Sequence, residues 1–343
     1  IMSNDSSPAI PEFRDQRIGL IIFGALQLAI GCFCVLGALF TSLLLLVNPS
    51  NMPPEAQVDA KMMLPGIMFY VLVAILFTTL GFGSILAKRW AWSLTVVISW
   101  LWMIIGLFAV IVLVLVMPSV MSAMPQQGRA NLPPGSLSAV MAISMILVGI
   151  FYVVLPGSFL VFYQRSATWE TCRRRDPKAR WTERCPLPLL ALAIMLGYSA
   201  LWLPFQLLYG GGVAPFFGKL VSGAAGVVLI LASAVIMAFL AWGIYGRKMA
   251  AWWGTLVFWT FWGVSASITF SKVGLLELYE MMEIPPNQLE LLKKSGMLDG
   301  NYLIASMIGG FVCALVFLLW VRRYFVTVHG PVTSSFFGPI DHQ

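Results

Sequence analysis

Three methionines are the residues whose type and spacing come closest to a metal site in this chain. Met117, Met121 and Met124 are spaced at i, i+4 and i+7, which would place them on one face of a helix. Thioether sulfur is a soft ligand that suits Cu(I). We expect Pro118 to interrupt that helix, and methionine is also a common filler of apolar interfaces. Copper(I) handling is therefore a minor alternative, and we otherwise expect no cofactor.

The residues that most often catalyse reactions lie outside the long apolar segments of the sequence. All 14 Asp and Glu fall in connections or tails, and both histidines, His329 and His342, are near the C-terminus. Lys219 and Lys272 are at the outer ends of their segments, where long side chains can snorkel. A serine nucleophile would lack a base, and neither haem ligation nor a carboxylate proton relay can be built. We expect a protein that is not an enzyme.

Polar residues inside the apolar segments suit helix packing better than chemistry. Gln27, Gln206 and scattered Ser and Thr residues can form hydrogen bonds between helices. The five cysteines show no framework spacing, so we expect free thiols. Cys172 and Cys185 share one basic connection that contains no histidine, which argues against a zinc site.

The elements that must carry these residues are membrane-spanning helices. Of 343 residues, 59% are hydrophobic and 10% are charged, against about 25% charged in a soluble domain. A spanning helix needs about 20 predominantly apolar residues. Eight segments meet that length: 18–47, 64–87, 91–117, 137–163, 188–209, 217–245, 250–273 and 301–324. The sequence therefore predicts an all-α, polytopic integral membrane protein with eight transmembrane helices.

The distribution of basic residues predicts the orientation of these helices. The tails and the connections on their side of the membrane hold 15 Lys and Arg, and the opposite loops hold 6. Basic residues are enriched on the cytoplasmic side of membrane proteins. We therefore expect a multi-pass protein of the plasma membrane or the bacterial inner membrane, with both termini in the cytoplasm.

The sequence also contains an internal repeat with a shift of 160 residues. Seven positions between 83 and 102 are identical to their counterparts between 243 and 262, among them Trp92 with Trp252 and Trp102 with Trp262. An even number of helices per unit gives two parallel four-helix repeats. The predicted organisation is an N-terminal segment (1–17), a first repeat (18–163), a basic linker (164–187), a second repeat (188–324) and a C-terminal tail (325–343).

Basic and aromatic residues mark the predicted contact sites. Trp92 and Trp252 suit the membrane interface, whereas Trp102 and Trp262 lie deeper and are expected to face other helices. The net charge of +7 points to anionic lipid headgroups and not to nucleic acid. The residues predicted to contact lipid or a partner are Lys88, Arg89, Arg173, Arg174, Arg175, Lys178, Arg180, Arg247 and Lys248.

These features leave two main hypotheses for function. The sequence carries no phosphate loop, selectivity-filter sequence or transporter fingerprint. We expect a structural or accessory subunit that contacts partner membrane proteins or forms a homo-oligomer. The alternative is an uncoupled channel or facilitator for a neutral or hydrophobic solute, with its passage along the repeat axis.

Overall fold

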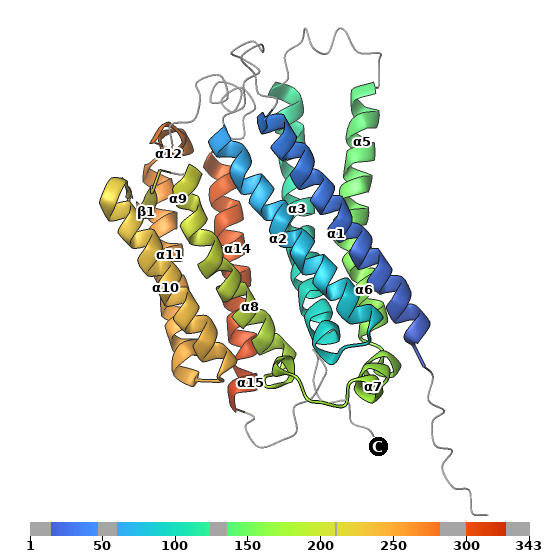
Figure 1. Cartoon of the computed structure of the whole chain (residues 1–343). Helices are drawn as coiled ribbons and strands as arrows, with labels where there is room; N and C mark the ends of the chain where they lie inside the picture. The colour runs from blue at the N-terminus through green and yellow to red at the C-terminus, as the bar shows by residue number, and fades with distance from the viewer. Residues whose placement is uncertain (1–14, 47–59, 124–135, 210, 282–299, 327–343) are drawn as a thin grey trace, which may run out of the picture.

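The computed structural model describes residues 15–46, 60–123, 136–209, 211–281 and 300–326 (Figure 1). These residues form a bundle of long helices with one short β-hairpin. Seven of the helical stretches are long and apolar enough to cross a membrane. The protein is thus an all-α polytopic membrane protein, as predicted.

The helices fall into two groups joined by a compact linker. The first group contains α1 (Arg17–Leu46), α2 (Ala60–Ile85), α3 (Arg89–Ala123), α5 (Ser136–Gly149) and α6 (Leu155–Tyr163). The linker contains α7 (Ser166–Arg175) and a 3₁₀ turn (Trp181–Glu183). The second group contains α8 (Leu187–Trp202), α9 (Gln206–Tyr209), α10 (Gly223–Tyr245), α11 (Met249–Lys272), α12 (Leu275–Met281), α14 (Gly300–Val321) and α15 (Arg323–Val326).

The seventh predicted span is not among the seven apolar stretches. It forms α11, a helix of 24 residues beside α10 in Figure 1. Its sequence contains four Trp, three Ser and three Thr, so it is less apolar than its neighbours. The structure therefore shows seven apolar spans where eight were predicted, and α11 is the difference.

Helices α1 and α2 approach each other closely because glycines replace side chains at their contact. A Cβ atom on Gly31 would lie 2.6 Å from the hydroxyl oxygen of Thr78. One on Gly24 would lie 2.9 Å from the carbonyl oxygen of Gly81, and one on Gly81 would lie 2.8 Å from that of Gly24. Small residues at such a contact let two membrane helices pack backbone to backbone.

The fourth predicted span, 137–163, is not a continuous α-helix. Between α5 and α6 the chain forms a π-helical turn, Ile150–Val154. Pro156 comes two residues after this turn, and its missing N–H cannot donate to the carbonyl of Tyr152 four residues earlier. Gly106 of α3 packs here, since a Cβ atom on it would lie 2.5 Å from that carbonyl oxygen. The irregular turn and the glycine therefore fit each other.

The sixth predicted span, 217–245, begins too early. Its first residues belong to a hairpin of β1 (Ala214–Phe216) and β2 (Lys219–Val221), which pair antiparallel with Pro215 opposite Leu220. The φ angles of Phe217 (+43°) and Gly218 (+89°) are those of a tight hairpin turn. Lys219 thus lies on a strand and not at the end of a spanning helix. Helix α10 starts only at Gly223.

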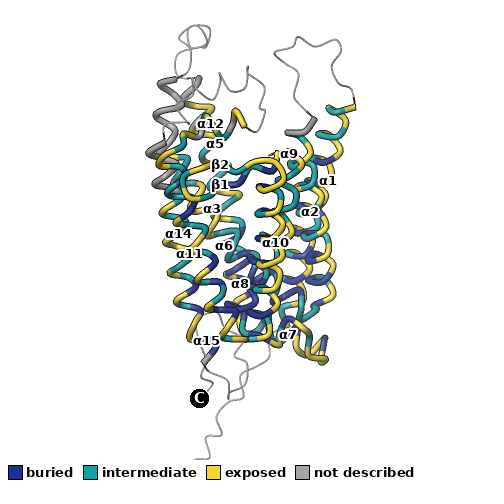
Figure 2. Tube along the Cα trace, turned by 90° about the vertical axis from the view of Figure 1, so that its left-hand side faces the viewer, coloured by how far each residue is buried: buried dark blue, intermediate teal, exposed yellow. Residues whose placement is uncertain are grey.

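The linker, the α2–α3 turn and the α10–α11 turn share one end of the bundle, which we call the linker end. Figure 2 shows buried residues concentrated toward this end, whereas exposed positions line the outer faces of the helices. The first turns of α8 are buried there, including Leu189, Leu190 and Leu192. They belong to one apolar core with Val97 of α3 and Trp252 of α11. The two groups of helices therefore share their core at the linker end.

Candidate functional site at the linker end

Four helices of the first group meet in a buried polar cluster formed by Gln27, Ser84, Thr95 and Tyr163. The Tyr163 hydroxyl donates to Ser84 Oγ (2.8 Å), and Ser84 Oγ donates to Gln27 Oε1 (3.0 Å). Gln27 Nε2 in turn donates to Thr95 Oγ1 (3.0 Å). These residues come from α1, α2, α3 and α6. The prediction that Gln27 forms hydrogen bonds between helices is confirmed.

The cluster is closed to solvent and uses its polar groups internally. Each of its four side chains is at most 2% exposed. A buried polar group costs free energy unless it is paired, and here each member is hydrogen-bonded to another. The cluster contains an amide and three hydroxyls but no carboxylate, imidazole or amine. This arrangement suits a clamp between helices and offers no general base for catalysis.

Two tryptophans at equivalent places in the sequence anchor a helix in each half of the chain. Trp92 Nε1–H donates to the main-chain oxygen of Tyr163 (2.6 Å). Trp252 Nε1–H donates to the main-chain oxygen of Leu318 (2.8 Å). Both indole rings are nearly fully buried. Trp92 thereby ties α3 to α6 in the first half, and Trp252 ties α11 to α14 in the second half.

The turns before these tryptophans also share an unusual backbone geometry. Ala87 and Arg247 have φ angles of +49° and +55°, in the left-handed region that non-glycine residues seldom adopt. The N–H of Lys88 donates to a carbonyl five residues earlier at 2.8 Å, and the N–H of Lys248 does so at 2.9 Å. Each pair of positions is 160 residues apart.

A close contact beside each turn is also the same in the two halves. A Cβ atom on Gly83 would lie 2.5 Å from the Cβ atom of Ala91, and one on Gly243 would lie 2.5 Å from that of Ala251. Only glycine fits at either position without a shift of the neighbouring helix. The sequence matches found with a shift of 160 residues therefore correspond to matched local structure.

The deeper tryptophans differ from each other in their ring contacts. Trp102 packs edge to face against Phe77 of α2 (5.4 Å between centroids) and Phe151 of the π turn (5.1 Å), so it faces other helices as expected. Trp262 has ring contacts with Phe258 and Phe261 of its own helix. The indoles therefore do not have matched surroundings, although their positions match in sequence.

The linker is a folded element whose charges pair with one another. Arg89, at the start of α3, forms an ion pair with Glu183 and lies over the ring of Trp169 at 5.1 Å. Asp176, which is 4% exposed, accepts two hydrogen bonds from the guanidinium of Arg180 at 2.6 and 2.9 Å. Such bidentate pairs are among the strongest charged contacts in proteins. The linker is thereby fastened to the α2–α3 turn.

Burial and these pairs shift three pKa values in the linker. The Arg180 guanidinium, through its hydrogen bonds, lowers the pKa of Asp176, and the carboxylate stays charged at neutral pH. Burial raises the pKa of the Cys172 thiol and that of the Cys185 thiol to about 12 each. A thiol with so high a pKa is a poor nucleophile and a poor metal ligand at neutral pH.

Three further arginines of the predicted contact set form ion pairs at the surface. Arg173 and Arg174 pair with Glu170 at 3.0 and 3.2 Å, one helical turn apart on α7. Arg175 pairs with Asp15 at 3.2 Å. All three arginine side chains are more than a third exposed, so their pairs are accessible to solvent and weak.

Four other members of the predicted contact set, Lys88, Lys178, Arg247 and Lys248, form no ion pair within the described part of the chain. Arg247 instead donates a hydrogen bond from its guanidinium to the main-chain oxygen of Arg184. Contact with lipid or a partner stays a prediction for the whole set. Its positive charge is least neutralised at these four residues.

The predicted copper-binding methionines are only partly within the described residues. The backbone at Met117 and Met121 belongs to α3, whereas Met124 lies outside the described residues. Helix α3 continues past Pro118 to Ala123, so the expected interruption at Pro118 is wrong. A proline inside a helix removes one backbone hydrogen bond and can kink the helix, and here the helix continues beyond it. The copper hypothesis stays a prediction.

The folded linker and the hairpin are the features that sequence reasoning missed. Asp176 and Arg180 are four residues apart, a spacing that signals a local ion pair. The pairing of Arg89 with Glu183 joins residues 94 positions apart and has no local signal.

No protein-family model, curated protein or solved structure matches this chain. The function must therefore be argued from the geometry.

Proposed function

We propose that this chain is a non-enzymatic membrane protein that serves as a structural or accessory subunit and contacts partner membrane proteins. The polar cluster carries the proposal, because its buried side chains are bonded to one another and clamp four helices. A rigid interior of this kind suits a scaffold. Large apolar side chains such as Phe33, Phe40 and Phe239 are more than 60% exposed on the outer faces, where other membrane helices or lipid can pack.

We further propose eight spanning helices arranged as two parallel four-helix repeats. Helix α11 follows α10 after a turn of three residues and returns toward the hairpin, where Ser265 and Thr269 bind it. Several of its polar residues therefore have partners inside the protein, which makes a low-apolarity span tolerable. The matched turns, glycine contacts and tryptophan anchors support the repeat.

This proposal places both termini in the cytoplasm, in a plasma membrane or bacterial inner membrane. The support is the 15 to 6 division of Lys and Arg in the sequence. Reporter fusions test it: a fluorescent protein that folds only in the cytoplasm should be active at either end. If α11 does not span, the two ends report opposite sides, and the eight-span topology is refuted.

Native co-purification tests the proposed role. Mild solubilisation from the native membrane should yield the protein with a partner membrane protein, or a second copy, at fixed stoichiometry. The control is the Gln27→Leu variant, which weakens the interior and leaves the outer faces unchanged. Recovery of an isolated chain under every mild condition would contradict the role.

The alternative is an uncoupled passage for a neutral or hydrophobic solute along the repeat axis. The matched geometry of the two halves favours it, because passages often form between repeats. Purified protein in liposomes would then increase solute flux.

Copper(I) handling is the minor alternative, and elemental analysis tests it. The protein is purified without chelator and loaded with copper under reducing conditions. Near-stoichiometric copper would support the methionine site.

A further inference from the structure

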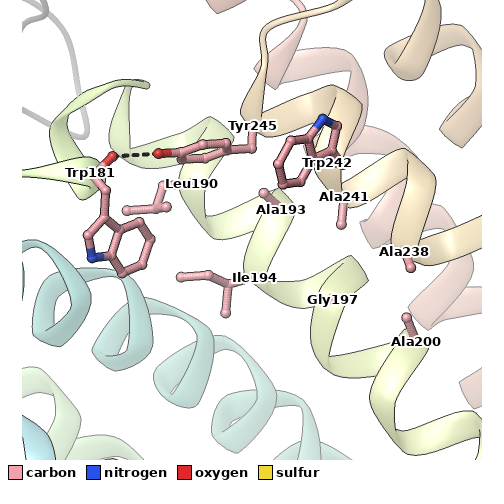
Figure 3. A pocket seen from close by; sticks show the side chains of 10 residues that line it. All are labelled: Trp181, Leu190, Ala193, Ile194, Gly197, Ala200, Ala238, Ala241, Trp242 and Tyr245. Carbon is pink, nitrogen blue, oxygen red and sulfur yellow. Dashed lines mark hydrogen bonds between the residues drawn. The ribbon is translucent and has the colours of Figure 1, made fainter.

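A shallow apolar groove crosses the outer surface of the second group of helices (Figure 3). It has a volume of about 320 Å³ and is lined by α8, α10 and the linker. Its floor consists of small residues, Ala193, Gly197 and Ala200 on α8 with Ala238 and Ala241 on α10. No lining residue is charged.

Aromatic side chains stand at the end of the groove that is nearest the linker. Trp242 is 73% exposed, and Trp181 is 49% exposed. The hydroxyl of Tyr245 donates to the main-chain oxygen of Trp181 at 2.9 Å, drawn as a dashed line in Figure 3. Trp and Tyr are enriched where a membrane meets water. This end of the groove therefore fits the level of the lipid headgroups.

The length of the groove favours a lipid chain over a partner helix. Its lining on α8 runs from Leu190 to Ala200, which at 1.5 Å per residue is roughly 15 Å. That is about half of the roughly 30 Å hydrocarbon core, or one leaflet. A spanning partner helix would use the whole thickness, whereas an acyl chain stays in its own leaflet.

Positive charge lies beside the aromatic end of the groove. Arg247 comes two residues after Tyr245, and its guanidinium is held on the main-chain oxygen of Arg184. Arg184 comes three residues after Trp181, and Lys248 follows Arg247. None of these three cations forms an ion pair with an acid in the described ranges. The acids nearest in the sequence, Asp176 and Glu183, are already paired with Arg180 and Arg89.

We propose that the groove binds one anionic phospholipid. One acyl chain lies over Gly197 between α8 and α10, and the phosphate contacts Arg247, Lys248 and Arg184. Guanidinium and ammonium groups both donate to phosphate oxygens, and each basic residue near the surface strengthens the attraction to anionic lipid. The proposal makes the predicted lipid contact of Arg247 and Lys248 more specific. It requires only that α8 and α10 span the membrane.

Native mass spectrometry of delipidated protein tests the proposal. Palmitoyl-oleoyl phosphatidylglycerol is titrated against the phosphatidylcholine of the same chains, and we expect the first phosphatidylglycerol to bind about tenfold more tightly. The double variant Arg247→Asn, Lys248→Gln should lose that preference. Asn suits the left-handed φ of +55° at position 247, and Lys248→Gln alone replaces the double variant if it misfolds.

The Gly197→Leu variant tests the groove itself. A Cβ atom on Gly197 meets no other atom within 4 Å, so a larger side chain can start from this position and occupy the groove. We expect it to weaken binding of both lipids about tenfold. The matched control is Gly157→Leu, also in open space on α6. It should bind both lipids as the wild type does.

Three results would overturn the proposal. The first is equal binding of the two lipids to the wild type. The second is an unchanged phosphatidylglycerol preference and affinity in Gly197→Leu, which would leave general headgroup contact standing but remove the groove. The third is displacement of phosphatidylglycerol by millimolar inorganic phosphate, which would show that the cations alone form the site.

Discussion

Replacing Gln27 by Leu should destabilise the bundle more than the same change at Gln206. Gln27 is 1% exposed and forms two hydrogen bonds, to Ser84 and Thr95, at 3.0 Å each. Leucine keeps the volume but removes both bonds. With about 0.6–1.5 kcal/mol for each bond, and a further penalty for hydroxyls left without their partner, we expect a loss of about 2 kcal/mol.

Unfolding in mixed micelles with increasing SDS measures this loss. Gln206 on α9 is half-buried, and its side chain has no hydrogen bond to another described residue, so Gln206→Leu should change the free energy of unfolding by less than about 0.5 kcal/mol. The double variant Gln27→Leu, Ser84→Ala should cost about 1 kcal/mol less than the sum of the single changes, because a residue without its partner is removed. Equal costs for Gln27→Leu and Gln206→Leu would refute the clamp.

Three other predictions concern the linker and the hairpin. Asp176→Asn should destabilise the protein by about 2 kcal/mol at pH 7. Because the pKa of Asp176 is lowered, this difference from wild type should persist above about pH 3.9 and vanish as the pH falls through the lower folded pKa, measured by unfolding at several pH values. Gly226→Ala should lower the thermal midpoint markedly, since its Cβ atom would lie 1.8 Å from the carbonyl oxygen of Gly212; a normal midpoint would contradict that contact. Cys172 and Cys185 should resist maleimide at pH 7.5 in folded protein and react after SDS denaturation, as peptide mapping would show; labelling of both in the folded protein would contradict their burial.

Helix positions were largely predictable because hydropathy depends on local composition. The first three predicted spans agree with α1, α2 and α3 to within a few residues at the linker end. The span at 217–245 was placed too early because Phe217, Leu220 and Val221 are apolar, although Pro215 and Gly218 signalled a turn. Hydropathy alone cannot distinguish an apolar hairpin from the first turn of a helix.

The polar cluster and the linker contacts were less predictable because they depend on tertiary packing. The sequence indicated that Gln27 needs a partner, but Thr95 and Ser84 are 68 and 57 residues away. Pro156 signalled an irregularity in the fourth span, while the π turn also needs the room that Gly106 provides. Such pairings arise only when helices are placed side by side.

The most direct test of the proposed role is the mass of the assembly ejected from native membrane vesicles without detergent. The chain alone has a mass of 37.8 kDa. The accessory role predicts a larger mass that equals this chain plus a partner membrane protein, or a second copy, in a constant ratio. A bare 37.8 kDa chain carrying only lipid, together with solute flux in liposomes, would contradict it and favour the passage.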